Sequence, residues 1–321
     1  MNALAPITEN TALSSHPEAV ARAKVFLRAS KAESTLRGYR SDWAHFSAWC
    51  ASNGAEPLPA APDTVGVYLS SLADQLKVGS LQRRVNAISQ AHQAAGLPSP
   101  THAAIVRGIM RGIRREKGSA NAPKDAILTE QLRAMVADCN AEKMIGLRDR
   151  AALLLTFAGA LRRSEVVALN VDDLNFTREG LVVRLKRSKT DQEGQGQEVV
   201  ILYGADPEVC PIRVVQLWLE RTGITVGPVL RSIQNGKVQD RGLDPWIVAR
   251  IVKQHARAAG LDPAKVAGHS LRSGHATSAS VGGAPLELIQ NTLRHERAEM
   301  TRKYVRVAQR FRQTSSRFLG L

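Results

Sequence analysis

The sequence contains few of the residues on which several classes of protein depend. Its 321 residues include only three cysteines, Cys50, Cys139 and Cys210. These stand too far apart to suggest either a metal-binding pair or a disulfide framework. Single thiols of this kind are typical of buried positions in a reducing compartment. We therefore expect three buried thiols and no cysteine-based metal centre.

Long hydrophobic runs are also missing. The longest apolar-rich run, residues 151–161, is too short to cross a bilayer and contains Thr156 and Gly159. Residues 1–16 mix polar and apolar side chains and lack the apolar core of a secretory signal. We therefore expect no membrane partner and a cytoplasmic location.

Acidic residues are scarce relative to basic ones. The 44 Lys and Arg residues outnumber the 29 Asp and Glu residues, which gives a formal net charge of +15. Such an excess favours a polyanionic partner, because neutralising phosphates releases condensed counterions. A ribosomal-type or merely basic soluble protein has a similar balance. The charge therefore indicates nucleic acid binding but no particular activity.

Aromatic residues make up only 4% of the sequence, and several of them fall in one segment. Tyr39, Trp43, Phe46 and Trp49 recur at steps of three and four, which places them on one face of a helix. Such a stripe far more often packs in a core than holds a ligand. We expect it to face the core of a helical domain.

The pattern of the sequence changes once along its length. Residues 1–16 indicate a loose tail, and residues 17–115 predict an all-helical bundle with basic edges. Residues 116–126 combine Gly, Ser, Asn and Pro, as linkers do. In a second domain, 127–321, β-branched runs at 180–186 and 198–203 predict a hairpin. The expected fold is mainly α-helical, with a helical bundle followed by a mixed α/β domain that holds a small antiparallel sheet.

Three features of the second domain carry side chains suited to phosphate chemistry. Arg162 follows an apolar helix, and its planar fork matches two phosphate oxygens. His269 and Arg272 are three residues apart and share a helix face. Lys189 lies on the hairpin turn, where an amine can protonate a leaving oxygen. Taken singly, each has a more ordinary explanation: an arginine at a helix end, a chance His-x-x-Arg, and a solvated turn lysine.

A fourth feature is Tyr304, which a process of elimination singles out among the four tyrosines. Tyr39 and Tyr68 lie on aromatic or apolar faces of the first bundle, and Tyr203 ends a strand. Tyr304 alone stands in a strongly basic segment, nine residues after His295. A phenol with an ordinary pKa of about 10 needs a cationic pocket to become a useful nucleophile. By itself, the pattern also fits a tyrosine that packs its ring on an amphipathic helix.

Taken in order, these features resemble the tyrosine recombinase (phage integrase) family, which includes Cre and the Xer recombinases. That family shows a Gly-x-x-Arg-x-Ser-Glu box, a Lys on a β-hairpin, His-x-x-Arg, and His or Trp nine residues before a nucleophilic Tyr. The sequence has the same order: Arg162 with Glu165, Lys189, His269 with Arg272, His295 and Tyr304. The resemblance runs from residue 129 to the C-terminus. More loosely, the first domain is similar to the family's SAM-like core-binding domain.

The resemblance implies a DNA recombinase that needs neither a metal ion nor a nucleotide cofactor. Tyr304 would attack the scissile phosphate and form a 3′-phosphotyrosyl bond. Arg162 and Arg272 would hold the non-bridging oxygens as charge develops in the transition state. His269 would take or share the proton of the nucleophile. A 5′-hydroxyl of another strand would then reverse the step, which conserves the phosphodiester energy.

The remaining roles and two departures from the family pattern concern neighbouring residues. The resemblance implies that His295 hydrogen-bonds the phosphate, that Lys189 protonates the leaving 5′-oxygen, and that Glu165 orients the basic cluster from behind. Arg294 stands where the family commonly has Gly before this histidine. The box also holds two consecutive arginines. We assign the role to Arg162, because Ser-Glu follows at the expected offset, and expect Arg163 to point to solvent or DNA.

Double-stranded DNA is the implied partner. In the resembled family, four protomers assemble on two DNA sites, and each passes a C-terminal segment to its neighbour. Residues 309–321 carry apolar side chains that suit docking on a neighbour, namely Phe311, Phe318, Leu319 and Leu321. Such a tail can also pack on its own domain. The resemblance implies a homotetramer on DNA and a monomer when free, and it is compatible with accessory DNA-bending proteins.

Two other functions fit a related set of residues. A type IB topoisomerase or a telomere resolvase shares the Arg, Lys, Arg, His and Tyr set, but the short chain and the closer motif match favour a recombinase. A DNA-binding regulator that kept the fold would lack a catalytic residue, and the sequence has them all.

Overall fold

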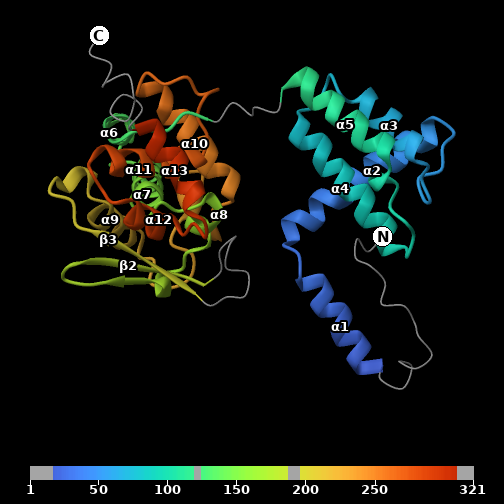
Figure 1. Ribbon diagram of the computed structural model, residues 1–321. Coiled ribbons are helices and arrows are strands. Elements are labelled where there is room, and N and C mark those ends of the chain that lie inside the picture. The colour runs from blue at the N-terminus through green and yellow to red at the C-terminus, as the bar shows by residue number, and fades with distance from the viewer. Residues whose placement is uncertain (1–16, 119–123, 187–195, 309–321) are drawn as a thin grey trace, which may run out of the picture. The chain divides into compact units, whose positions relative to one another are not determined.

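The structure is a computed structural model that describes residues 17–118, 124–186 and 196–308 (Figure 1). The chain divides into two compact units, Met1–Ala122 and Pro123–Leu321. The division falls inside the segment 116–126, and the last helix of the first unit ends at Lys117. The expected loose tail at 1–16 and the C-terminal segment 309–321 lie outside the described residues.

The described part of the first unit consists of helices and their connecting turns (Figure 1). Helices α2 and α4 pack against each other, as do α3 and α5. The elements are α1 (Pro17–Ala29), α2 (Glu33–Ser52), α3 (Pro62–Ser71), α4 (Val78–Ala94), the 3₁₀ turn η2 (Pro100–His102) and α5 (Ala104–Lys117).

The aromatic stripe of α2 lies against the core of this unit, which confirms the prediction for three of its members. Phe46 is completely buried, and Trp43 and Trp49 are partly buried against the same cluster. Tyr68 on α3 is also completely buried, with its ring centroid 4.9 Å from that of Phe46. Aromatic pairs at this spacing add to the stability that burial alone provides.

The second unit is organised around α7 (Met144–Ala158), which is buried along most of its length. Figure 1 shows the other helices around it, and α6, α9, α10 and α11 all contact it. A helix that is apolar on nearly all sides belongs in the interior of a domain. The remaining helices are α6 (Thr129–Asp138), α8 (Arg163–Ala168), α9 (Pro211–Thr222), α10 (Pro245–Ala258), α11 (His269–Val281), α12 (Leu286–Leu293) and α13 (Ala298–Ala308).

The predicted hairpin is present as β2 (Gly180–Leu185) and β3 (Gln197–Leu202). Val183 pairs with Val199, and Leu181 pairs with Ile201, so the alternating buried side chains of both strands face the core. A short strand, β1 (Leu174–Phe176), adds to the free side of β2, giving the order β1-β2-β3. Lys189 falls in the connection between β2 and β3, outside the described residues.

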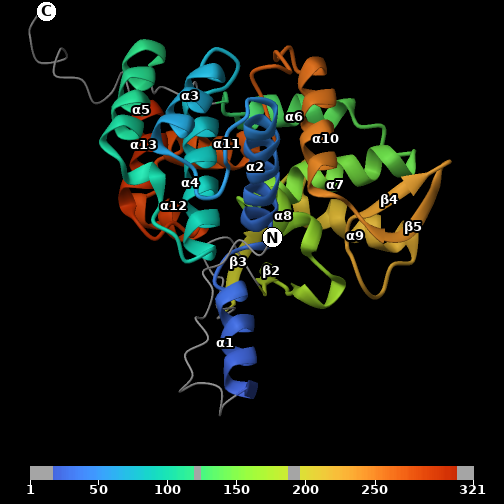
Figure 2. The same cartoon turned by 90° about the vertical axis from the view of Figure 1, so that its right-hand side faces the viewer.

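A second hairpin, β4 (Arg231–Gln234) and β5 (Lys237–Gly242), is absent from the sequence-based expectation. It projects from the unit in Figure 2. Its turn is Asn235-Gly236, and both residues have positive φ, at 50° and 75°. Asn-Gly between strand-forming residues is a strong signal for a two-residue hairpin turn. The fold class, mainly helical with small antiparallel sheets, agrees with the prediction.

Helix α11 is held in place by a close backbone crossing. The main chain of Ile127 passes α11 at Gly274, where a β-carbon would come within 1.8 Å of the Ile127 carbonyl oxygen. The amide of Ile127 donates to the Ser270 carbonyl at 3.0 Å. Only glycine permits this approach, and the crossing fixes the first turn of α11, which carries His269 and Arg272.

Three further findings bear on the sequence-based expectations. Cys50, Cys139 and Cys210 are buried thiols, as predicted. Within the described ranges, His, Cys, Asp and Glu side chains form no cluster that could hold a metal ion. No helix in the described part of the chain has the length and apolar character needed to span a membrane.

Candidate active site

Three turns and one helix of the second unit bring together five of the six residues assigned to catalysis. Arg162 immediately precedes α8, the His-x-x-Arg pair occupies the first turn of α11, and His295 follows α12. Tyr304 lies on α13, which packs against both α11 and α12. The sixth residue, Lys189, lies outside the described residues.

The hydroxyl oxygen of Tyr304 lies 3.1 Å from Nε2 of His269. Tyr304 is half-buried against a small apolar cluster that includes Ala276 and Leu293, whereas His269 is exposed. Burial raises the pKa of the Tyr304 phenol, and the positive charge of Arg272 opposes part of that rise. The phenol is therefore protonated at neutral pH, and its neighbour His269 is placed to receive the proton.

Arg272 is the most deeply placed cation of the group, with 1% of its surface exposed. Its two terminal nitrogens donate to the carbonyl oxygens of Ala160 and Leu293, which belong to two different turns. Burial, together with the positive charges of Arg162 and Arg294, lowers the pKa of Arg272 to about 9. At neutral pH the guanidinium stays charged. A desolvated cation of this kind interacts strongly with an anion that enters the site.

His295 is held between Tyr304 and a buried threonine. Its ring lies 6.2 Å, centroid to centroid, from that of Tyr304 at an interplanar angle of 22°. Its Nδ1 is 2.9 Å from the hydroxyl oxygen of Thr301, which is completely buried. Burial and the charges of Arg272 and Arg162 lower the pKa of His295 to about 4. The imidazole is therefore neutral at physiological pH.

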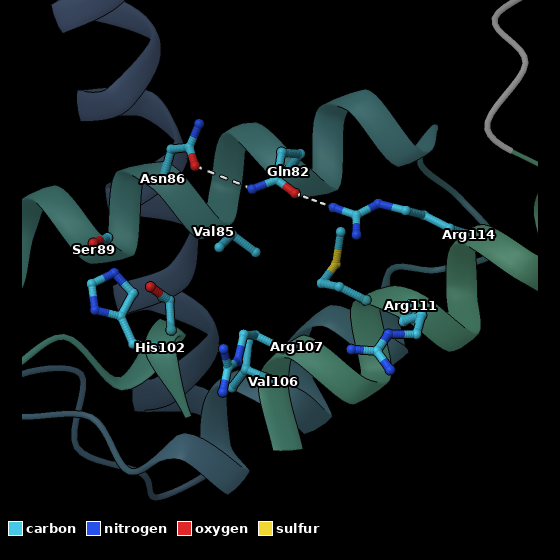
Figure 3. A pocket seen from close by; sticks show the side chains of 11 residues that line it. Gln82, Val85, Asn86, Ser89, His102, Val106, Arg107, Arg111 and Arg114 are labelled. Carbon is cyan, nitrogen blue, oxygen red and sulfur yellow. Dashed lines mark hydrogen bonds between the residues drawn. The ribbon is translucent and has the colours of Figure 1, made fainter. Parts of the chain in front are cut away.

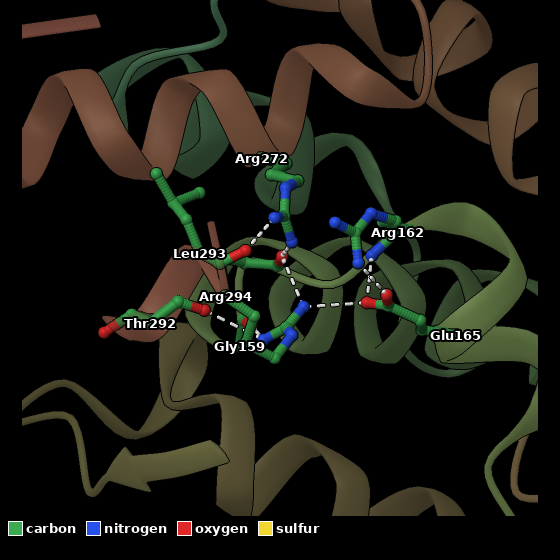
Figure 4. A network of polar contacts seen from close by, with 8 residues as sticks. Gly159, Arg162, Glu165, Arg272, Thr292, Leu293 and Arg294 are labelled. Carbon is green, nitrogen blue, oxygen red and sulfur yellow. Dashed lines mark hydrogen bonds and ion pairs between the residues drawn. The ribbon is translucent and has the colours of Figure 1, made fainter. Parts of the chain in front are cut away.

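A buried carboxylate organises the arginines (Figure 4). Glu165 accepts from the Arg162 side chain at 2.6 Å, from the Arg162 amide at 2.8 Å, and from Arg294 at 2.7 Å. Burial tends to raise the pKa of Glu165, but the adjacent Arg294 and Arg162 outweigh it and hold that pKa below its usual value. Glu165 is therefore ionised, and it binds one guanidinium through each oxygen.

Neighbouring basic residues take other positions. Arg163 is exposed, as expected, and its side chain lies across Gly268, where a β-carbon would come within 2.2 Å of it. Lys186, just after β2, binds Asp173 at 2.7 Å.

Sequence reasoning missed the contacts of Arg294 and Thr301. Arg294 carried a signal, because it replaces the family's Gly at a helix end, where φ is often positive.

A second polar site lies in the first unit, in a pocket between α4 and α5 (Figure 3). Arg107, Arg111 and Arg114 are three or four residues apart on α5, so they share one face of the helix. Gln82 on α4 accepts from Arg114 at 2.5 Å and donates to Asn86 at 3.2 Å. Guanidinium groups suit phosphates, and side-chain amides suit base edges.

Comparison with known proteins identifies relatives that cover most of the chain. A family model described as "Phage integrase family" matches residues 126–310. An integrase/recombinase xerD homolog of Selenomonas ruminantium is 39% identical over 308 residues, which cover 93% of this chain and 89% of that protein.

Solved structures of lambda integrase share the fold. A lambda integrase dimer bound to a COC′ core site has a TM-score of 0.57 at 17% identity, over 88% of this chain and 92% of that one. A lambda integrase tetramer bound to a Holliday junction has a TM-score of 0.57 at 15% identity, over 85% of this chain and 72% of that one.

Proposed function

Because the chain belongs to the phage integrase family and is thus a DNA breaking-and-rejoining enzyme of the tyrosine recombinase type, we propose that Tyr304 is its nucleophile. One observation carries the assignment. The Tyr304 hydroxyl lies 3.1 Å from His269 and beside the buried Arg272 and the neutral His295. Of the four tyrosines, Tyr304 is the one in hydrogen-bond contact with a residue of the His-x-x-Arg pair.

In the proposed reaction, the Tyr304 oxygen attacks the scissile phosphorus and a bond to the 3′-phosphate forms. The bond to the 5′-oxygen breaks, and that oxygen leaves as a hydroxyl. His269 accepts the phenol proton, which the raised pKa of Tyr304 keeps on the oxygen until DNA binds. Arg162 and Arg272 neutralise the non-bridging oxygens, where negative charge develops.

Two further roles complete the reaction. His295 donates a hydrogen bond to the phosphate through Nε2, with the Thr301 hydroxyl donating to its Nδ1. Lys189 protonates the leaving 5′-oxygen. The assignment of Lys189 rests on its place in the sequence, and it is favoured by the engagement of nearby Lys186 with Asp173. Rejoining reverses these steps with another 5′-hydroxyl, so the phosphodiester energy is retained and no nucleotide or metal cofactor is required.

We propose that duplex DNA binds both units. In the first unit, Arg107, Arg111 and Arg114 would supply phosphate contacts, and the Gln82–Asn86 pair, which lines the same pocket (Figure 3), would contact base edges. The net charge of +15 supports this polyanionic partner. The family relationship supports four protomers on two DNA sites and a monomer without DNA. We expect the activity in the cytoplasm, with residues 127–321 as the catalytic domain and 17–115 as the DNA-binding domain.

Covalent trapping tests the nucleophile. The substrate is a pool of nicked duplexes with randomised sequence around the nick, so that a short fragment is lost after cleavage and the adduct accumulates. Denaturing gels compare wild type, Tyr304→Phe and Tyr203→Phe. We expect adducts with wild type and Tyr203→Phe and none with Tyr304→Phe. An adduct that persists in Tyr304→Phe would overturn the assignment.

The same experiment separates recombination from a topoisomerase function. Sequencing the trapped duplexes shows whether cleavage selects a site. We expect enrichment of one sequence. Efficient relaxation of supercoiled DNA without any enriched sequence would instead indicate a type IB topoisomerase.

A further inference from the structure

Arg294 has an unusual combination of backbone and side-chain properties. Its φ and ψ are 52° and 50°, the left-handed region that favours glycine. Its side chain is only 3% exposed. A buried arginine in a left-handed backbone conformation is disfavoured on both counts unless its contacts compensate. The contacts of Arg294 therefore decide what it does.

All the hydrogens on the two terminal nitrogens of Arg294 are engaged. Nη1 donates to the carbonyl oxygens of Thr292 at 2.8 Å and Gly159 at 3.3 Å. Nη2 donates to the Ala160 carbonyl at 3.2 Å and to Glu165 at 2.7 Å. Each terminal nitrogen of a guanidinium carries two hydrogens, so these four bonds use them all. The group that remains, Nε, is buried.

Two of the four acceptors of Arg294 are shared with the two arginines of the active site (Figure 4). The Ala160 carbonyl also accepts from Arg272. Glu165, which accepts from Arg294 through Oε2, accepts from the Arg162 side chain through Oε1. Arg294 therefore links the turn after α12 to the turn before α8 and to the first turn of α8. The links to the Ala160 carbonyl and to Glu165 end on groups that also hold Arg272 and Arg162, respectively.

We propose that Arg294 is a positioning residue that fixes the spacing of Arg162 and Arg272 through Glu165 and the Ala160 carbonyl. It does not contact the phosphate, because its terminal hydrogens are engaged and its side chain is buried. Arg162 binds Glu165 through one terminal nitrogen, and Arg272 makes one bond through each of its two, so both keep terminal hydrogens for the phosphate. The inference rests on the proposed function, since it assumes that these two arginines hold the scissile phosphate.

The charge of the cluster supports this role. Three guanidinium groups surround one carboxylate, so Glu165 neutralises only part of the positive charge. Without a tether, Arg162 and Arg272 would repel each other and separate when no DNA is bound. A carboxylate and a carbonyl that are each shared between two guanidinium groups hold the cations near each other before the phosphate arrives. Such preorganisation lowers the cost of reaching the transition state.

The test compares Arg294→Gly with two matched variants. Glycine is favoured at a left-handed position, so Arg294→Gly removes the contacts without adding backbone strain. Asn235→Gly introduces glycine at another left-handed residue, which has a φ of 50° and lies in the exposed β4–β5 turn. Arg294→Lys keeps the charge but cannot form the four bonds, and it carries the test if the glycine variant does not fold. Folding is checked by thermal unfolding, and DNA affinity is measured separately.

The readout is the single-turnover rate of adduct formation at saturating protein. We expect Arg294→Gly and Arg294→Lys to slow it by about tenfold to a hundredfold, the range expected when reacting groups are misplaced. The DNA affinity of all three variants should stay within about threefold of wild type. The rate of adduct formation by Asn235→Gly should stay within the same limit. A loss confined to DNA affinity, or an unchanged rate in a folded Arg294 variant, would overturn the proposal.

A double-mutant cycle tests the route through Glu165. In a Glu165→Gln background, Arg294→Gly should cost at least about threefold less than in wild type, because the shared carboxylate is already lost. An equal cost in both backgrounds would show that Arg294 does not act through Glu165. The wild-type adduct keeps the two hypotheses apart: its absence counts against the proposed function, whereas its presence with unaffected Arg294 variants counts only against this inference.

Discussion

The hydroxyl oxygen of Thr301 lies 2.9 Å from Nδ1 of His295, and Thr301 is completely buried. The low pKa of His295, about 4, makes its ring neutral, so one ring nitrogen carries a proton and the other does not. A threonine hydroxyl that donates to Nδ1 leaves the proton on Nε2. We propose that the Thr301 hydroxyl is the donor in this contact, which selects the tautomer that can donate to a phosphate.

Thr301→Val should slow cleavage while leaving DNA binding unchanged. Valine fills the same space but cannot donate to His295, so the ring is free to adopt the other tautomer. A single hydrogen bond of about 1 kcal/mol corresponds to a rate loss of about fivefold. The rate of adduct formation at saturating protein measures the effect. Thr301→Ser, which keeps the hydroxyl, is the control. An equal loss of cleavage rate in Thr301→Ser and Thr301→Val would contradict the tautomer argument.

The consecutive arginines allow a matched test of position. Arg162→Ala should lower the cleavage rate by about a hundred- to a thousand-fold, as expected when one preorganised donor to the transition state is lost. Arg163 is exposed, so Arg163→Ala should change the rate at saturating protein by less than about threefold. Adduct formation and DNA affinity are measured for both variants. Similar rate losses in the two variants would mean that the phosphate-binding role has been assigned to the wrong arginine.

Much of the architecture follows from local sequence signals. The aromatic stripe of the first unit and the β2–β3 hairpin were predictable, because periods of 3.6 and 2 residues report which face is buried. The Asn235-Gly236 pair also indicates a hairpin turn. Its flanking strands, however, have half-exposed or exposed side chains and little apolar alternation. Periodicity alone therefore gave no reason to predict β4 and β5.

The interior of the site could be predicted only in part. The order of the motifs singled out the six candidate residues, from Arg162 to Tyr304, because the residues of each motif lie close together in the sequence. The contact between Arg294 and Glu165 joins residues 129 apart, and the close crossing of Ile127 at Gly274 depends on tertiary packing. No local pattern encodes such contacts. They emerge only when α8, α11 and α12 are placed in space.

Gly274→Ala should destabilise the second unit. The added methyl would meet the carbonyl oxygen of Ile127, so the backbone crossing that fixes the first turn of α11 must shift. Overpacking of this kind typically costs about 1–3 kcal/mol. Urea unfolding without DNA measures the loss. Gly282→Ala, at the other end of α11, makes only ordinary contacts and should cost much less. Equal losses would show that the crossing tolerates a side chain.

A buried histidine makes stability depend on pH. His255 on α10 contacts Asp138 at 2.7 Å and Asp149 at 3.3 Å, and Asp149 also pairs with Arg148. Burial by itself lowers the pKa of His255, but hydrogen bonds to Asp149, Cys139 and Asp138 outweigh it and raise the pKa to about 10. His255 is therefore positively charged in the folded protein at neutral pH and ties α10 to α6 and α7.

The sign of the pH effect follows from this raised pKa. The folded state binds the proton of His255 more tightly than the unfolded chain, whose ordinary value is 6.5. The contribution to stability is therefore complete below about pH 6.5 and is lost as the pH rises towards about 10. The free energy of unfolding in urea should fall across this range in wild type. It should fall less steeply in His255→Gln, which keeps a polar side chain but does not titrate. Parallel curves for the two proteins would show that His255 is not the group responsible.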